Sequence, residues 1–166
     1  MLKIKIYLLL LIMILLFSSC SSRRTTPYIR TVNNAILFAS PEGKIVLRTA
    51  HNMAYDKSVV VRGSCWNYIN AIYKKAGFNG YKKSKIIFKG SKRGSYADQK
   101  IIQRGDWLYY VNYSYHNVGH SGIFVAWMNY SKKKALMLSY KGSGRVPARY
   151  KIYNLSGVYR IKRGKI

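Results

Sequence analysis

The sequence predicts an α+β fold in which helices come first in the chain and an antiparallel sheet follows. Residues 65–76 carry apolar side chains at helical spacing. From residue 105 to residue 163, short runs rich in apolar and aromatic side chains alternate with turn residues, as in a series of strands. Sixteen tyrosines strengthen the second pattern, because aromatic side chains suit the half-buried surface of a sheet. With 166 residues, the chain is long enough for one domain with a substantial core.

The chain begins with a short apolar leader. Two lysines, Lys3 and Lys5, precede an uninterrupted apolar run at 6–17. This run is shorter than the ~20 residues of a membrane span and fits the centre of a secretory signal. The leader ends in FSSC, which resembles the lipobox of bacterial lipoproteins, where the cysteine takes a diacylglycerol and the leader is cut just before it. The resemblance implies a signal peptide over 1–19 and a lipid on Cys20; ordinary signal cleavage and an uncleaved anchor are the alternatives.

All three outcomes place the body outside the cytoplasm. Lipidation would hold it in the cell envelope, on the extracytoplasmic side of a bacterial membrane. The polar, basic stretch after the leader suits a tether, which we place at 20–35, and the domain is expected at 36–166. Lipidation of Cys20 would leave Cys65 as the only thiol of the body, and a lone thiol cannot form a structural disulfide within the chain.

The charge of the chain is strongly positive, since 30 lysines and arginines against four acids give a formal net charge of +26. This favours polyanionic surroundings such as nucleic acid, anionic lipid or an anionic cell envelope. We expect no nucleic-acid partner, because the sequence has no zinc-finger, helix-turn-helix or RNA-binding motif. The expected partner is peptidoglycan or another anionic envelope polymer. The histidines, cysteines and acids show no ligand spacing, so neither a metal nor another cofactor is expected.

Two helices are predicted in the first half of the domain, at 45–55 and 65–76, with a loop or short strand at 56–64 between them. The second helix is the clearer one, because its apolar residues recur at steps of four, three and four. Ser64 can serve as its N-cap, and Gly77 follows as a C-terminal stop.

The second half is predicted to be mostly strand, after a basic, Gly- and Ser-rich crossing segment at 79–104 that is expected to be irregular. Five strand candidates follow, at 105–114, 118–130, 134–140, 149–155 and 157–163. Because they follow one another without intervening helices, they predict an antiparallel sheet.

Cys65 is the candidate nucleophile. It lies in the first turn of its helix, where free backbone N–H groups and the positive end of the dipole favour a thiolate and lower the thiol pKa. A thiolate suits covalent catalysis; the alternative is a small buried apolar residue, since Cys65 shares one side of the helix with Ile69. A cysteine nucleophile needs a base, and His120 opens a strand immediately before an apolar run. His116 is expected in a solvated turn and His51 in the preceding helix.

Together these pieces resemble the NlpC-like superfamily of circularly permuted papain-fold cysteine peptidases and amidases, to which CHAP domains are related. The pieces are Cys65 followed by WNYINAIYKKAGF, Gly105-Asp106 followed by WLYY, and His120 followed by SGIFVAW. The resemblance covers roughly residues 45–140. It implies a permuted papain-like fold, with N-terminal helices packed on an antiparallel sheet.

The resemblance also implies roles for individual residues. Cys65 matches the nucleophile and His120 the general base, and the two side chains are expected within ~4 Å of each other. Ser139 matches the third polar group, which orients the imidazole; a serine can hold the ring by one hydrogen bond but supplies no negative charge. Tyr55 matches a tyrosine whose hydroxyl helps to hold the oxyanion, with a packed aromatic residue as the alternative. Asp106 is expected to be a structural acid at the start of its strand.

The function implied by this resemblance is that of an envelope-anchored thiol hydrolase, a cysteine peptidase or amidase that cleaves an amide bond in peptidoglycan stem peptides. Two other functions stay open at this point. The same Cys–His pair supports acyl transfer or lipid hydrolysis in relatives of this fold. A non-catalytic lipoprotein could instead bind anionic envelope polymers through its lysines and arginines.

Overall fold

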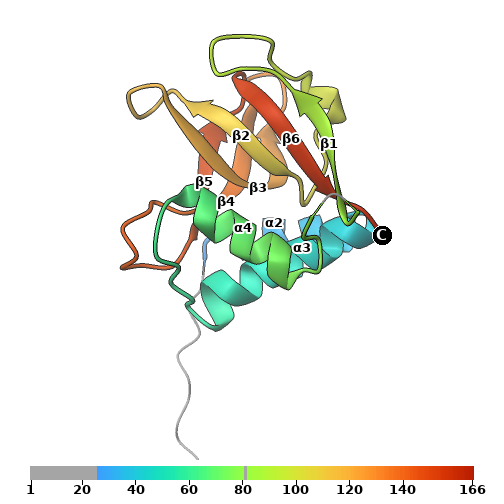
Figure 1. Ribbon diagram of the computed structural model, residues 1–166, viewed down its shortest axis with the longest axis vertical. Helices are drawn as coiled ribbons and strands as arrows, with labels where there is room; N and C mark the ends of the chain where they lie inside the picture. The colour runs from blue at the N-terminus through green and yellow to red at the C-terminus, as the bar shows by residue number, and fades with distance from the viewer. Residues whose placement is uncertain (1–25, 81) are drawn as a thin grey trace, which may run out of the picture.

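The structure is a computed structural model that describes residues 26–80 and 82–166. In this part of the chain, three α-helices lie against one face of a six-stranded sheet (Figure 1). All neighbouring strands are antiparallel, and their order is β1-β6-β2-β3-β4-β5. The α+β class and the antiparallel sheet expected from the sequence are confirmed.

The helices and strands follow one another along the chain with short connections. The helices are α2 (Ile29–Leu37), α3 (Pro41–His51), which a π-helical turn (Asn52–Asp56) continues, and α4 (Cys65–Lys75); a 3-10 turn spans Gln99–Ile101. The strands are β1 (Ser84–Lys89), β2 (Trp107–Asn112), β3 (Val118–Asn129), β4 (Lys134–Ser139), β5 (Arg149–Asn154) and β6 (Val158–Gly164). Within the described ranges, no helix has both the length and the apolar character needed to cross a membrane.

Helix α2 occupies much of the segment expected to be a tether, 20–35. Its Val32 and Ala35 are buried in the core. The packed body therefore begins earlier than residue 36, and the tether boundary at 35 is corrected accordingly. The expectation depended on the small polar residues that follow Cys20, and that cysteine itself lies outside the described residues.

Helix α3 begins at Pro41, before the predicted start at 45. The fixed φ of a proline suits the first helical position, where its missing N–H is not needed. The hydroxyl of Ser40 accepts a hydrogen bond from the backbone N–H of Gly43 at 3.2 Å and so caps the helix. The Ser-Pro pair therefore marked this start in the sequence.

Helix α4 confirms the predicted helix at 65–76 to within one residue. The side-chain oxygen of Asn67 accepts from both the backbone N–H and the hydroxyl of Ser64, at 2.9 Å each, which fixes the start of the helix. Gly77 ends the helix with a φ of +84°, a left-handed conformation that favours glycine. Ile69 and Ile72 are fully buried on the side that faces the sheet.

Strand β1 corrects the expectation of an irregular segment at 79–104. It pairs with β6 at the edge of the sheet, from Ser84 opposite Gly164 to Lys89 opposite Arg160. Its lysines and partly exposed apolar residues interrupt the alternation of apolar and polar residues that marks a half-buried strand. Charged side chains of this kind are typical of protected sheet edges. The other five strands overlap the ranges predicted for them.

The two faces of the sheet carry separate apolar clusters. Along β2, Trp107 and Tyr109 point toward the helices, whereas Leu108 and Tyr110 point to the opposite face. Side chains of directly paired residues lie on the same face of a sheet. Because His120 pairs with Tyr110, the imidazole belongs to the face away from the helices.

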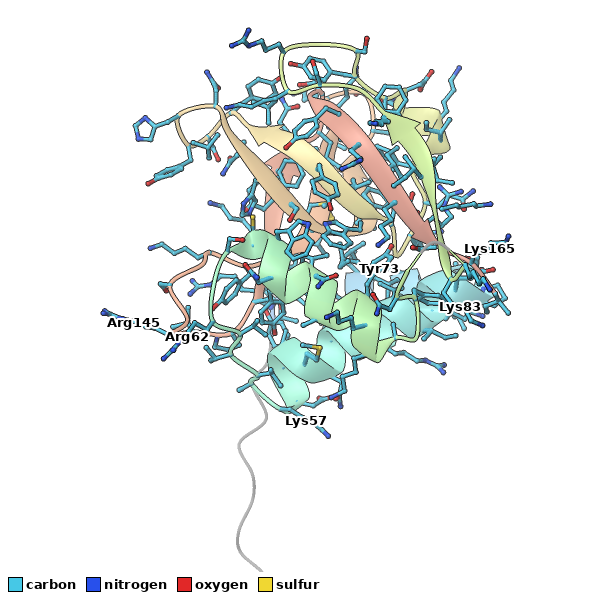
Figure 2. The ribbon with its side chains drawn as sticks, in the orientation of Figure 1. Lys57, Arg62, Tyr73, Lys83, Arg145 and Lys165 are labelled. Atoms are coloured by element: carbon cyan, nitrogen blue, oxygen red, sulfur yellow. The ribbon has the colours of Figure 1, made fainter. Side chains whose placement is uncertain are left out.

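Tyr73 and Asp106 connect helix α4, strand β2 and strand β6. Tyr73 lies between α4 and the sheet (Figure 2), and its hydroxyl accepts a hydrogen bond from the backbone N–H of Trp107 at 3.0 Å. The carboxylate of Asp106 is fully buried and accepts two hydrogen bonds from Arg163, at 2.7 and 2.8 Å. Asp106 thus holds the start of β2 against β6, as expected of a structural acid.

Replacing Asp106 by asparagine is expected to lower the free energy of unfolding by about 3 kcal/mol, because a largely buried Arg163 loses its charged partner. Chemical denaturation at neutral pH measures this change. Asp98→Asn is the matched control, since the exposed carboxylate of Asp98 accepts from the backbone N–H of Lys100 and asparagine caps equally well. Equal losses in the two variants would contradict the role assigned to the ion pair.

Candidate active site

Cys65 is the first residue of helix α4 and a half-buried free cysteine. The backbone N–H groups of a first helical turn have no acceptor within the helix, so they can serve a ligand or a developing negative charge. The next residue, Trp66, donates its indole N–H to the hydroxyl of Tyr109 at 3.1 Å. This bond fixes the start of the helix against β2, directly beside the thiol.

His120 lies near the start of β3 and is enclosed by two tyrosines. Its ring meets Tyr110 edge-on at a centroid distance of 5.5 Å, and the ring of Tyr153 lies 5.7 Å away. Burial, followed by the positive charge of Lys151, lowers the pKa of His120 to about 4. The imidazole is therefore neutral at pH 7, and its burial makes it a weaker proton acceptor than an exposed histidine.

The direct contact between Cys65 and His120 expected from the sequence is not seen among the described residues. In the described part of the chain, no hydrogen bond joins the thiol to the imidazole, whose ring lies on the sheet face away from α4. Burial is the main cause that raises the pKa of Tyr110 and of Tyr153, and a charge on Cys65 raises both further. These two rings enclose His120 on the sheet face away from α4, so the sheet separates the imidazole from the helix that carries the thiol.

Ser139 reaches the imidazole through Tyr153. Its hydroxyl makes a hydrogen bond of 2.8 Å with the hydroxyl of Tyr153, and in residues 26–80 and 82–166 it makes none with His120. Tyr153, which the sequence did not single out, is therefore the residue that contacts the imidazole. Its position depends on how β5 curves back toward β3, and no local pattern in the sequence indicates it.

Tyr55 is packed among aromatic residues. Its ring stacks on Tyr150 at 5.1 Å and on His51 at 5.3 Å, and its hydroxyl accepts a hydrogen bond from the backbone N–H of Tyr150 at 3.2 Å. This matches the packed-aromatic alternative. His51 bonds the hydroxyl of Tyr150 at 3.0 Å, and His116 is exposed in the β2–β3 turn, both in agreement with the sequence prediction.

Two buried polar atoms of β2 and β3, on the helix face of the sheet, have no hydrogen-bond partner among the described residues: the indole nitrogen of Trp107 and the hydroxyl of Ser121. Ser121 of β3 pairs with Tyr109 of β2, whose side chain points toward the helices. An unpaired buried polar group costs about 1–3 kcal/mol. A ligand or a bound water can supply the missing hydrogen bond to such groups.

Lowering the pH from 7 to 4.5 is expected to destabilise the wild-type chain by about 2 kcal/mol more than a His120→Gln variant. Burial lowers the pKa of His120 from 6.5 to about 4. The unfolded chain therefore binds the proton first, and stability falls as the pH falls through this window. Urea unfolding at both pH values measures the difference, with His116→Gln as the exposed control. Parallel pH profiles for wild type and His120→Gln would show that the imidazole is not held neutral by burial.

No protein-family model matches this sequence, and no curated protein matches it either. The candidate site is therefore defined by the geometry of this chain alone.

Proposed function

We propose that this protein is an envelope-anchored thiol hydrolase that cleaves an amide bond in peptidoglycan stem peptides. The observation that carries the proposal is the position of the Cys65 thiol in the first turn of α4, where free backbone N–H groups favour a thiolate. The order of helix, Gly-Asp strand and histidine strand supports a permuted papain-like fold as the finer description.

In the proposed reaction, His120 takes the thiol proton of Cys65, and the sulfur attacks the carbonyl carbon of the substrate. The backbone N–H of Cys65 holds the resulting oxyanion. His120 then protonates the leaving amine, and water releases the acyl group from the thioester. Because His120 lies on the sheet face away from α4, this reaction requires a rearrangement near the start of β3 that brings the imidazole to the thiol when substrate binds.

Tyr109 takes the place of Tyr55 as the phenol that assists the oxyanion in this proposal. The hydroxyl oxygen of Tyr109 already accepts from Trp66, which leaves its own proton for another acceptor. Burial is the main cause that raises the pKa of Tyr109, and a charge on Cys65 also raises it, so the phenol stays protonated and lies close to the thiol.

The lipid anchor is a separate part of the proposal. It depends on the motif FSSC ending at Cys20, which lies outside the described residues. Metabolic labelling with a fatty-acid analogue should mark the wild type and not Cys20→Ala. Equal labelling of both would rule out the anchor at this position.

The proposed reaction is tested by product analysis. The purified full chain, held in a non-ionic detergent, is incubated with peptidoglycan fragments and separately with phospholipid vesicles, and the products are identified by mass spectrometry. New amino and carboxyl groups in the wall peptides support the amidase. Products from lipid alone support acyl transfer or lipid hydrolysis by the same residues. No product, together with no reaction toward a thiol-directed activity probe, supports a lipoprotein that only binds anionic polymers.

Replacing Ser139 by alanine is expected to lower kcat/KM only ~10-fold, because a neutral hydroxyl contributes about 1 kcal/mol of hydrogen bonding. Tyr153→Phe is the matched variant, since it removes the same 2.8 Å hydrogen bond from the other side and keeps the ring against His120. Similar modest losses are expected. A loss as deep as that of Cys65→Ala would show that Ser139 acts on the substrate directly.

A further inference from the structure

Two cations of strand β6 lie over aromatic rings beside the start of helix α4. The register places Arg160 opposite Tyr109 and Lys162 opposite Trp107, so each cation shares the helix-side face with its ring. The guanidinium carbon of Arg160 lies 5.6 Å from the centroid of Tyr109, and the ammonium of Lys162 lies 5.1 Å from that of Trp107. Such cation–π contacts hold the two positive charges in defined positions.

The aromatic rings under these two cations are in contact with the ring of the residue that follows Cys65. Trp107 and Tyr109 stack at 5.2 Å, and the ring of Trp66 lies 5.9 Å from that of Trp107. We call Trp66, Trp107 and Tyr109 the aromatic row. Trp66 directly follows Cys65 and is 45% exposed, so one end of the row is open to a ligand. Arg160 and Lys162 are therefore connected to the nucleophile by rigid, touching rings.

No acid neutralises these two cations within the described ranges. The chain has only four acids, and the one ion pair in this part of the chain joins Asp106 to Arg163. The Nε of Arg160 is buried without a hydrogen-bond partner among the described residues. Burial, followed by the charge of Arg160, lowers the pKa of Lys162. Two like charges held close together without a counterion form a site that an anion would stabilise.

We propose that Arg160 and Lys162 form a subsite for the carboxylate of a peptide whose chain lies along the aromatic row toward Cys65. The guanidinium can donate two parallel hydrogen bonds to a carboxylate, and the ammonium adds a third. The exposed ring of Trp66 and the half-buried ring of Tyr109 provide apolar contact for the carbon atoms next to that carboxylate. This inference rests on the proposed function, since it names the group by which the substrate of the same site is held.

The subsite is tested by binding rather than by turnover. The full chain carrying Cys65→Ala, in a non-ionic detergent, is titrated calorimetrically with N-acetyl-dialanine and with its C-terminal amide. The free acid is expected to bind at least ~10-fold more tightly than the amide. Arg160→Gln and Lys162→Gln are each expected to weaken binding of the acid by ~10-fold or more. Arg160→Lys, which keeps the charge but loses the two parallel donors, is expected to bind the acid with an affinity between that of Cys65→Ala alone and that of the added Arg160→Gln variant.

Lys83 and Lys165 are the matched controls. They lie together beside the C terminus (Figure 2), and the backbone N–H of Lys165 bonds the carbonyl of Lys83 at 2.9 Å. Replacing either by glutamine is expected to leave binding unchanged. Equal binding of acid and amide, or equal losses in all four glutamine variants, would overturn the subsite. Because the Cys65→Ala chain cannot turn over, this outcome is independent of whether wild type hydrolyses any amide.

Discussion

Replacing Cys65 by alanine is expected to abolish amide hydrolysis by the full chain. Cys65 is the only free cysteine in the described part of the protein. No other side chain around His120 provides a comparable nucleophile, because the neighbouring hydroxyls belong to tyrosines and serines without an adjacent charged base. The measurement is release of amino groups from peptidoglycan fragments, followed over hours so that a slow residual reaction is visible.

Cys65→Ser and an unfolding curve are the controls for this result. Serine keeps the size of the side chain and its place at the start of α4, but its hydroxyl ionises far less readily than a thiol. We expect Cys65→Ser to fold like the wild type and to be nearly as inactive as Cys65→Ala. Undiminished hydrolysis by Cys65→Ala would end the thiol mechanism.

The second large effect is expected at His120. Replacing it by alanine should lower kcat/KM by roughly 10²–10⁴-fold, because general acid–base catalysis by one side chain contributes about that much. The loss should not add to that of Cys65→Ala, since the two residues act as a unit. The activities of the single and double variants on the same wall fragments give the size of the His120→Ala loss and show whether the two losses add.

His51 and His116 are matched controls for His120. His51 is bonded to Tyr150, and His116 lies in an exposed turn. Replacing His116 by glutamine should leave the activity unchanged, and replacing His51 should act mainly through stability. If the His51 variant is folded but loses more activity than His120→Ala, then the base has been assigned to the wrong histidine.

The sequence predicted those parts of the fold that depend on local patterns. Helix α4 was predicted because its apolar spacing, N-cap and terminal glycine are all contained within residues 64–77. Strands β2 to β6 follow in the same way from short apolar and aromatic runs. Helix α2 and strand β1 were missed because their faces are only partly buried, so tertiary packing rather than local pattern decides their structure.

The sequence proposes which residues form the candidate site, but it does not predict which of them touch. The chain order identifies Cys65 and His120, but the face on which His120 lies follows from its pairing with Tyr110. The contact of Ser139 with Tyr153 depends on the curvature of β4 and β5, which no short segment encodes. Likewise, the stacking of Arg160 on Tyr109 requires the register between β2 and β6. Long-range register is the information that a single sequence lacks.

The sheet described here has two edge strands, β1 and β5, and both carry cations: Lys85 and Lys89 on the first, Arg149 and Lys151 on the second. Unpaired strand edges are templates on which identical chains can assemble into fibres, and charged side chains oppose this. Chains crowded in the plane of a membrane would meet edge to edge often, so this repulsion keeps them apart. An anionic polymer that covers the cations would remove the repulsion. The anionic polymer proposed here as a partner would then also allow the chains to cluster.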